Sequence, residues 1–376
     1  MHKILLIFGT RPEAIKLCPV VRGLREHPSQ FDVKVCVTAQ HREMLDQVLG
    51  AFQVNPEYDL DLMLPGQTLF QSTSRILAGL EPVLRHEKPA MVIVQGDTTT
   101  TFCGALAAFY SHIPVAHVEA GLRTHDLRQP FPEEMNRVVA SRLTALHFAA
   151  TEKAADNLRA EGVPPEAISV TGNTGIDAVL YVRDGLERGA LRGGEWPELD
   201  SSKKLIVVTA HRRESFGDGF VRICRALAKI ADRDDVQLVY PVHPNPNVQD
   251  PVQRYLSAHR HVRLVEPLSY VPFVDLMRRA YLLITDSGGI QEEGPSLGKP
   301  ILVLREKTER PEAVTAGTVK LVGTDEERII GEASILLGNS AAYRQMSRVH
   351  NPYGDGQASA RISKLIHSYL TKTAVI

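Results

Sequence analysis

Ionisable side chains gather just after the apolar run IPVAHV. The segment HVEAGLRTHDLRQPFPEEMNR (117–137) holds four carboxylates, three arginines and two histidines. When such groups are shielded from water, like charges raise the pKa of a carboxylate and opposite charges lower it. Neighbouring acids can then have different proton affinities, as general acid and base catalysis requires. The segment is therefore a candidate site for proton transfer beside cations that stabilise developing negative charge.

Polar residues also follow the first apolar run of the chain. In FGTRPEAIK, Gly9 and Arg11 lie in a predicted turn, and Pro12 suits the first position of a helix. The N-terminus of that helix, together with Arg11 and Lys16, would suit a diphosphate. A solvated turn with ordinary helix capping explains the same residues. The G-x-G-x-x-G pattern of dinucleotide-binding proteins is missing here.

Three further segments place single polar residues after apolar runs. Asp97 lies in VQGDTTTT and could be a functional residue or only the N-cap of a helix. His211 and Arg212 lie in TAHRRES, and His243 lies in YPVHPNP. A single histidine is more often structural than catalytic. Two histidines in equivalent positions favour a functional role.

TDSGGIQEE (285–293) is the most specific segment. Ser287, Gly288 and Gly289 predict a turn whose backbone N–H groups can approach a phosphate, and one of the two glutamates that follow could reach a ribose diol. A tight turn before a solvated helix is the alternative. Arg310, which follows another apolar run, is a further candidate for phosphate or ribose contact.

Short apolar runs alternate with longer helical patterns, such as 75–86 and 101–110, along most of the chain. Continuous apolarity in such short segments predicts parallel strands covered on both faces. The predicted strands are 3–8, 33–39, 90–95, 113–118, 145–150, 167–172, 205–210, 236–242, 262–267, 281–286, 300–304 and 319–323.

The alternation stops in a polar passage at 187–204 and then restarts, which predicts two Rossmann-like α/β domains. We expect one domain from 1–175 with a returning helix at 358–376, and a second from 176–357. Ligands of such sheets bind at the carboxyl ends of the strands. Two facing domains would therefore form a central cleft.

Composition excludes several classes of partner. The 376 residues include 43 Lys+Arg and 44 Asp+Glu, a net charge of −1, which gives no electrostatic reason to expect nucleic acid or an anionic membrane. The four cysteines have no ligand spacing and suit buried core positions in a reducing compartment. The N-terminal apolar run is too short for a signal sequence or a membrane span. We therefore expect a cytoplasmic protein without a metal.

The motifs together resemble the bacterial non-hydrolysing UDP-N-acetylglucosamine 2-epimerases, nearly from end to end. The pieces that carry the resemblance are FGTRPEAIK, TAQHREMLD, GDTTTT, HVEAGLRT, PFPEEMNR, AHRRES, TDSGGIQEE, GKP and TERPEAVTAGT. The resemblance implies a glycosyltransferase-B type fold in which the helix at 358–370 crosses back to the first domain. It also implies reversible epimerisation of UDP-GlcNAc to UDP-ManNAc, for surface polysaccharide synthesis and without a cofactor.

The implied chemistry is an elimination, because the C2–H bond of the sugar is not acidic without an adjacent carbonyl. Breaking the C1–O bond makes that hydrogen acidic and gives 2-acetamidoglucal and UDP. UDP then adds back after protonation on the other face. A base, an acid and cations for the diphosphate are needed.

Residue roles carried over from the family follow its motifs. Asp97, Glu119 and Glu133 form the acid/base group, and His211 lies near the diphosphate or assists proton transfer. Which carboxylate serves which face stays open. The remaining implied contacts, to UDP, to ribose or to the charge balance of the site, are Arg11, Lys16, Arg137, His243, Ser287, Gly288, Gly289, Glu293 and Arg310.

Some family members bind a second UDP-GlcNAc that activates the enzyme. The residues of this chain that match that allosteric site are the stretch AQHR (39–42), with Gln40, His41 and Arg42, and further Gln67, Glu133, Arg212 and His243. In those members an arginine precedes the glutamine, whereas this chain has Gly66 before Gln67. Glycine offers no charge to a diphosphate, so weaker activation is expected unless another cation replaces the arginine.

Two alternatives remain open. One is a hydrolysing epimerase that releases ManNAc, or an epimerase of a related diacetamido sugar nucleotide. The other is a glycosyltransferase or a silent nucleotide-sugar sensor on the same fold. A transferase needs no acid/base pair at C2, so the three carboxylates favour the epimerase. We expect a homodimer, with UDP-GlcNAc as its small-molecule partner.

Overall fold

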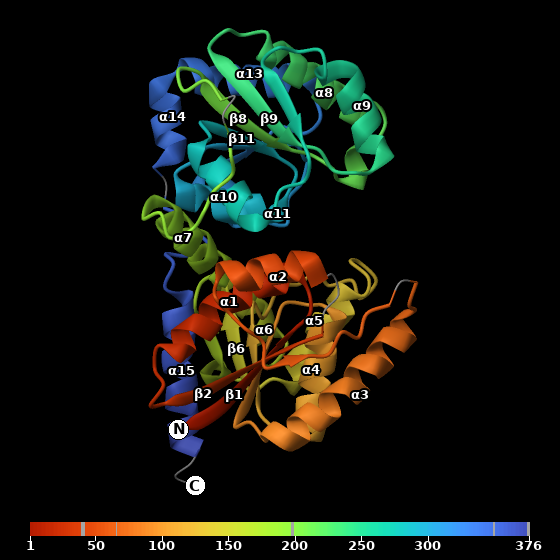
Figure 1. Ribbon diagram of the computed structural model, residues 1–376, viewed down its shortest axis with the longest axis vertical. Coiled ribbons are helices and arrows are strands. Elements are labelled where there is room, and N and C mark those ends of the chain that lie inside the picture. The colour runs from red at the N-terminus through yellow and green to blue at the C-terminus, as the bar shows by residue number, and fades with distance from the viewer. Residues whose placement is uncertain (39–41, 65, 197–198, 349, 374–376) are drawn as a thin grey trace. The chain divides into compact units, whose positions relative to one another are not determined.

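The chain forms two compact α/β units. The computed structural model describes residues 1–38, 42–64, 66–196, 199–348 and 350–373 (Figure 1). Unit 1 comprises Met1–Tyr181 and Gly354–Ile376, and unit 2 comprises Val182–Tyr353. The boundary lies inside helix α7 (Thr174–Glu187), a few residues beyond the division predicted at 175. The predicted division into functional domains stays a prediction.

Unit 1 is built on a parallel sheet of seven strands in the order β3-β2-β1-β4-β5-β6-β7. The strands are β1 (His2–Phe8), β2 (Phe31–Val37), β3 (Tyr58–Asp59), β4 (Met91–Gln95), β5 (Val115–Val118), β6 (Leu146–Ala149) and β7 (Ile168–Val170). Every residue of β4 and β5 is buried, as expected for a sheet covered on both faces. The chain order reverses between β1 and β4, the point at which doubly wound sheets bind ligands.

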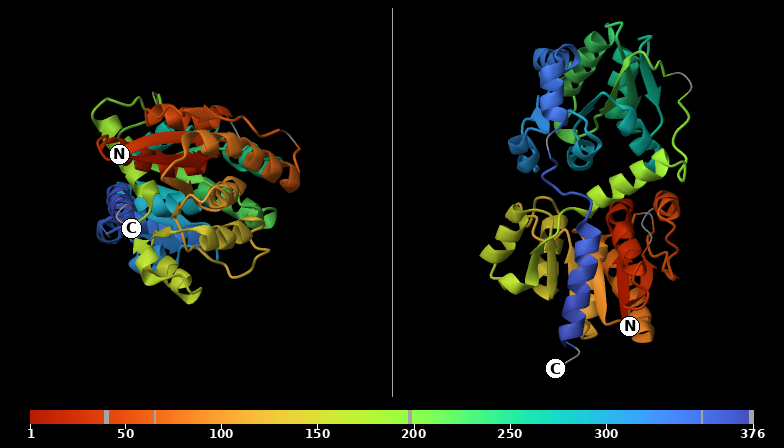
Figure 2. Two further views of the ribbon diagram at one scale, coloured as in Figure 1. Left: turned by 90° about the horizontal axis from the view of Figure 1, so that it is seen from below. Right: turned by 90° about the vertical axis from the view of Figure 1, so that its left-hand side faces the viewer.

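Helices cover the two faces of this sheet. They are α1 (Arg11–Arg25), α2 (Arg42–Ala51), α3 (Leu69–Glu87), α4 (Thr99–Tyr110), α5 (Glu133–Leu143), α6 (Glu152–Ala160) and α15 (Ala358–Thr373). Helix α1 contacts α2 and α15, whereas α4 contacts α3 and α5. The C-terminal helix α15 thus packs in unit 1 beside α1 (Figure 2). Asp177 fixes its start by accepting backbone hydrogen bonds from Ala358 (3.2 Å) and Ser359 (2.8 Å).

Unit 2 repeats the design with a six-stranded parallel sheet in the order β10-β9-β8-β11-β12-β13. The strands are β8 (Lys204–Thr209), β9 (Val236–Pro241), β10 (Val262–Val265), β11 (Leu282–Thr285), β12 (Ile301–Val303) and β13 (Val319–Leu321). Its helices are α8 (Asp218–Ala231), α9 (Pro246–Leu256), α10 (Tyr270–Arg279), α11 (Gly288–Glu293), α12 (Pro311–Ala316), α13 (Glu326–Gly338) and α14 (Ser340–Ser347). A buried core that includes Ile206, Phe220 and Leu238 joins the sheet to these helices.

The predicted fold class, α/β with two Rossmann-like domains, is confirmed. Each predicted apolar run overlaps one strand, while the two-residue strand β3 was not predicted. All four cysteines are buried and unpaired, and burial raises the pKa of each thiol to about 12. In the described part of the chain, every helix is too short or too polar to cross a membrane.

Candidate active site

Two carboxylates lie at the same edge of the sheet of unit 1, just after the carboxyl ends of neighbouring strands. Strands β4 and β5 pair in parallel with Gln95 opposite Val118, so Asp97 and Glu119 follow neighbouring strand ends. Glu119 has a φ of 64°, in the left-handed region. Such a backbone costs a non-glycine residue about 1–3 kcal/mol and is concentrated at functional sites. The fold therefore holds Glu119 in a conformation that local preference opposes.

The carboxylate of Glu119 is held on both oxygens. Lys16 Nζ contacts one oxygen as an ion pair, and Gln95 Nε2 donates to the other. Lys16 lies on α1, Gln95 ends β4 and Glu119 follows β5. Three separate elements thus converge on one acid. The position of Lys16, predicted to bind diphosphate, is beside a candidate catalytic carboxylate.

Asp97 has a different environment from Glu119. Burial raises its pKa, Arg137 lowers it, Glu119 raises it, Lys16 lowers it and Glu133 raises it. Its carboxylate lies 3.2 Å from a guanidinium nitrogen of Arg137. The net shift is upward, so Asp97 keeps a proton to higher pH than an ordinary aspartate. The two carboxylates are therefore chemically distinct, as an acid/base group requires.

Arg137 connects this pair to α5. Besides Asp97, its guanidinium approaches Glu134 (3.2 Å) and donates to the backbone carbonyl of Glu133 (3.4 Å). Asn136 of the same helix donates to the backbone carbonyl of Asp97 (2.9 Å). Helix α5 therefore positions Asp97 through two successive residues. The sequence-based role of Arg137 in charge balance fits this geometry.

Glu133 lines a cavity of about 610 Å³ next to these groups. The lining of this cavity also includes Gly66, Gln67, Thr98 and Asn136. Glu133 is close enough to raise the pKa of Asp97, as noted above. Gln67 donates from Nε2 to the backbone carbonyl of Leu62 (3.2 Å). The structure thus brings together one catalytic and one allosteric candidate of unit 1.

Most other charges of the 117–137 segment are structural. Arg123 makes a bidentate ion pair with Glu161 (2.6 and 2.9 Å). Glu134 accepts backbone hydrogen bonds from Thr124 (3.0 Å) and His125 (2.9 Å). The dense charge therefore serves two purposes: some groups fix the segment, and Glu119, Glu133 and Arg137 are left facing the candidate site.

Glu13 is a buried acid that the sequence interpretation missed. Its carboxylate accepts backbone hydrogen bonds from Gly9 (3.1 Å) and Thr10 (2.7 Å), and hydroxyl hydrogen bonds from Thr98 (2.7 Å) and Thr101 (3.3 Å). It thereby joins the turn after β1 to the turn that carries Asp97. The capping-box spacing from Thr10 to Glu13 could have predicted the backbone contact within α1, but not the contacts with the turn that carries Asp97.

Arg11 begins α1, and its guanidinium contacts the sulfur of Met44 (3.9 Å). Gln40 and His41, two of the allosteric candidates, lie outside the described residues. In unit 2, the backbone N–H of Arg212 donates to Asp286 (2.7 Å). The structure therefore places Arg212 just after β8, and its role in ligand binding stays a prediction.

The two histidines of unit 2 lie together. The rings of His211 and His243 stack with centroids 5.2 Å apart and planes 9° apart. His211 follows β8 and His243 follows β9, and these strands are neighbours. The prediction that both occupy strand ends is confirmed, and the stacking adds direct contact that the sequence did not show.

The TDSGGIQEE segment forms the turn between β11 and α11. Gly288 lies close to the guanidinium of Arg310, so that even a methyl group there would come within 3.4 Å of it. Arg310 donates to the buried Glu292 (2.6 Å), whereas Glu293 is partly exposed. Of the two glutamates, Glu293 is thus the more accessible to a ligand. Ser287 and Gly289 complete this turn.

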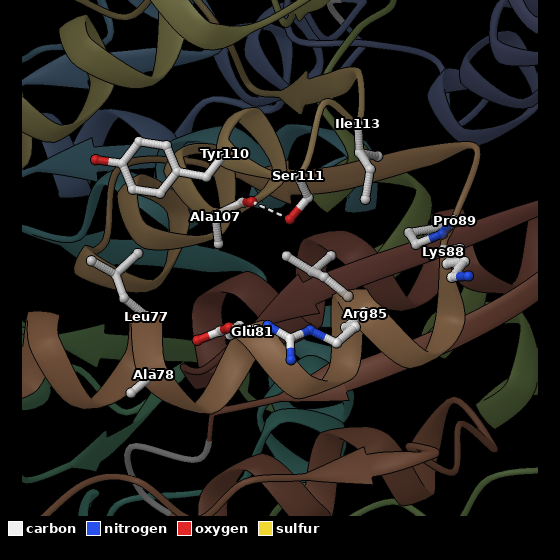
Figure 3. Close-up of a pocket in the computed structure, with 11 residues that line it drawn as sticks. Leu77, Ala78, Glu81, Arg85, Lys88, Pro89, Ala107, Tyr110, Ser111 and Ile113 are labelled. Carbon is white, nitrogen blue, oxygen red and sulfur yellow. Dashed lines mark hydrogen bonds and ion pairs between the residues drawn. The ribbon is translucent and has the colours of Figure 1, made fainter.

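A larger cavity, of about 750 Å³, lies between α3 and α4, away from the predicted site residues (Figure 3). Its lining includes Leu77, Tyr110 and the ion pair of Glu81 with Arg85 (2.5 Å). The carboxylate of this lining, Glu81, is paired with Arg85, and none of the predicted site residues belongs to it. No cluster of three or more His, Cys, Asp or Glu suited to a metal occurs among the residues that the structure describes.

Comparison with known proteins gives a consistent result. The profile of the family described as UDP-N-acetylglucosamine 2-epimerase matches residues 22–367. The UDP-N-acetylglucosamine 2-epimerase of Salmonella typhimurium is 58% identical over 98% of this chain and 99% of its own length. The crystal structure of UDP-GlcNAc 2-epimerase from Neisseria meningitidis bound to UDP-GlcNAc is similar with a TM-score of 0.87, at 47% identity and covering 97% and 100% of the two chains. The enzyme of Methanocaldococcus jannaschii in complex with UDP-GlcNAc and UDP has a TM-score of 0.74, at 33% identity and covering 98% and 99%.

Proposed function

The chain belongs to the UDP-N-acetylglucosamine 2-epimerase family, and from this membership we propose that it interconverts UDP-GlcNAc and UDP-ManNAc by elimination and re-addition of UDP. In the first step the C1–O bond to the diphosphate breaks while a carboxylate takes the proton from C2. The electron pair of the C2–H bond forms the C1=C2 double bond of 2-acetamidoglucal. In the second step UDP adds to C1, and C2 receives a proton on the opposite face.

One observation carries this proposal. Asp97 and Glu119 lie at neighbouring strand ends in unlike environments, one with a raised pKa and the other bonded on both oxygens by Lys16 and Gln95. A reaction that removes a proton on one face and returns one on the other needs two such groups. Which of them is base and which is acid stays open, as does the part of Glu133.

In this proposal, UDP is bound mainly by residues of unit 2, and Arg11 and Lys16 of unit 1 also contact it. The unit 2 residues are His211, His243, Ser287, Gly288, Gly289, Glu293 and Arg310. The accessible Glu293 and the closeness of Arg310 to Gly288 support contacts with ribose or phosphate. Family members with UDP-GlcNAc bound support the choice of ligand.

The physiological proposals rest mainly on family membership. They are a cytoplasmic enzyme without cofactor or metal, a role in surface polysaccharide synthesis, a homodimer, and weak activation by a second UDP-GlcNAc. For the last of these, the cavity shared by Gly66, Gln67 and Glu133 supports a binding region in unit 1.

Product analysis separates the proposal from its alternatives. UDP-GlcNAc is incubated with the protein, and the products are identified by ¹H and ³¹P NMR. We expect UDP-ManNAc in equilibrium with UDP-GlcNAc. Free ManNAc and UDP as the only products would identify a hydrolysing epimerase, and turnover only with an added sugar acceptor would identify a transferase.

A further inference from the structure

Asp286 fixes the backbone that carries His211. It follows β11, next to β8 in the sheet (Figure 1), and its side chain is 1% exposed. Its Oδ2 accepts backbone hydrogen bonds from His211 (2.6 Å) and Arg212 (2.7 Å). On the other side of the same peptide unit, the buried hydroxyl of Tyr240 donates to the carbonyl of Ala210 (2.6 Å). The peptide between residues 210 and 211 is thus held at both its N–H and its C=O.

The second oxygen of Asp286 faces the His211 ring. Oδ1 is buried and has no hydrogen-bond partner among the described residues. It lies 3.7 Å from Nδ1 of His211. A buried carboxylate oxygen without a partner is costly. A proton on Nδ1 of His211, which faces this oxygen, would relieve the cost at a shorter separation than 3.7 Å.

The neighbouring ring has the opposite preference. The backbone N–H of Asn245 donates to Nδ1 of His243 (3.2 Å), so this nitrogen carries a lone pair and the ring proton is on Nε2. The two stacked rings therefore present different groups at Nε2. His243 presents an N–H donor, and His211, with its proton on Nδ1, presents a proton acceptor.

The charges around His211 oppose one another. Burial lowers its pKa, the Asp286 carboxylate raises it, His243 and Arg212 lower it, and the net shift is downward. Asp286 is the only one of these groups that favours the imidazolium. With the side chain 41% exposed, Nε2 can exchange a proton with water.

We propose that Asp286 is a positioning residue that keeps one proton of His211 on Nδ1 and supports the imidazolium that faces the departing diphosphate. This inference rests on the proposed function, in which His211 acts near the diphosphate. Before the reaction Nε2 takes up a proton from a hydronium ion or buffer acid of the solvent, and the resulting N–H of the cation donates a hydrogen bond to the oxygen that gains charge as the C1–O bond breaks. Asp286 touches no substrate atom and acts through the ring.

The test replaces the charge and keeps the backbone contact. Asp286→Asn retains one oxygen that can accept from the N–H groups of His211 and Arg212. In protein labelled with ¹⁵N-histidine, NMR titration without substrate should show the pKa of His211 lower by about one unit or more, and part of the neutral ring with its proton on Nε2. Asp275→Asn is the matched control. Asp275 is also fully buried in unit 2, but its partners are Trp196 and two arginines of α10.

An unchanged pKa and tautomer of His211 in folded Asp286→Asn would overturn the proposal, because a purely structural role would leave both unmoved. If Asp286→Asn does not fold, the ¹⁵N spectrum of His211 in the wild-type protein tests the proposal instead. A ring proton on Nδ1 supports the proposal, and one on Nε2 overturns it. These measurements need no turnover, so failure of the epimerase assignment would be seen separately.

Activity provides a second readout. If His211 acts as a cation, kcat should fall on the alkaline side as it loses its proton. Asp286→Asn should then lower kcat about 10- to 100-fold, change KM less, and move the alkaline limb of the pH profile to lower pH. An alkaline limb at the wild-type pH would contradict the role.

Discussion

Arg137 places a guanidinium nitrogen 3.2 Å from the carboxylate of Asp97, although the two residues are forty positions apart in the chain. The same guanidinium lies 3.2 Å from the buried Glu134. The side chain of Arg137 is only 6% exposed, so its charge is weakly screened by water. Arg137 therefore ties the candidate acid/base group to the helix that follows the charged segment.

Replacing each candidate carboxylate by its amide tests the acid/base assignment. Asp97→Asn, Glu119→Gln and Glu133→Gln should each lower turnover at least about a hundredfold, the usual scale for a lost acid or base. UDP binding, measured by calorimetry, should survive. Glu166→Gln, at an exposed position, is the control. Wild-type rates in all three variants would remove these residues from the mechanism.

Solvent deuterium tests the route of the C2 hydrogen. In the proposed mechanism C2 is protonated by an acid of the enzyme. In heavy water this acid carries deuterium from the solvent, so the product should carry deuterium at C2. The reaction should also proceed after chelation and without added nicotinamide. Mass spectrometry and ¹H NMR of the nucleotide sugars provide the measurement. Product that keeps its original C2 hydrogen would instead indicate oxidation and internal hydride return.

Gly66 tests substrate activation. An added Cβ meets no atom within 4 Å there, but the φ of 74° would strain any other residue by about 1–2 kcal/mol. Gly66→Gln has this strain without a charge and is the matched control. The wild type should show weakly sigmoidal rates against UDP-GlcNAc, and Gly66→Arg should raise the cooperativity or lower the activating concentration relative to Gly66→Gln. Strong wild-type cooperativity that neither variant changes would refute the idea.

Two buried histidines should make the protein sensitive to acid. Burial lowers the pKa of His117 to about 3 and that of His147 to about 4, from an ordinary value of 6.5. The unfolded chain therefore takes up these protons first. The free energy of unfolding therefore decreases as the pH falls from about 6.5 towards these values. Each histidine contributes a decrease of about 1.4 kcal/mol for each pH unit.

His117→Gln should reduce this pH dependence in urea unfolding measured from pH 7 to pH 5. Glutamine can still donate to the Gly96 carbonyl, which lies 2.7 Å from Nε2 of His117. The exposed His27→Gln should leave the slope unchanged. Equal slopes in all three proteins would show that His117 does not resist protonation in the folded state.

The α3–α4 face is where we expect the homodimer to form. Tyr110 is 68% exposed beside the cavity of Figure 3, and Glu81 with Arg85 gives α3 both charges one turn apart, which suits the self-complementary patch of a two-fold contact. Tyr110→Ser should shift the mass measured by light scattering towards the monomer. Phe70→Ser removes an even more exposed aromatic outside this cavity and should not. A wild-type monomer would contradict the dimer itself.

The fold could be predicted because its signals are local. Buried parallel strands read as short continuous apolar runs, such as 91–95 and 282–285. The motifs placed Asp97, Glu119 and His211 at strand ends by the same logic. Strand β3 could not be predicted from the sequence, because a strand of two residues shows no pattern of hydrophobicity.

The sequence by itself determined the two α/β units, their strands and the residue types at the strand ends, since apolar runs and turn residues act over a few positions. Only the tertiary structure decided the partners of each charge. Glu13 and Asp286 read as ordinary polar residues, yet each becomes a buried acceptor once distant turns meet around it. The reason is that parallel strands bring together side chains from remote turns. Burial, which no stretch of sequence contains, then raises the pKa of Asp97 and of Glu13 above the usual range of a carboxyl group.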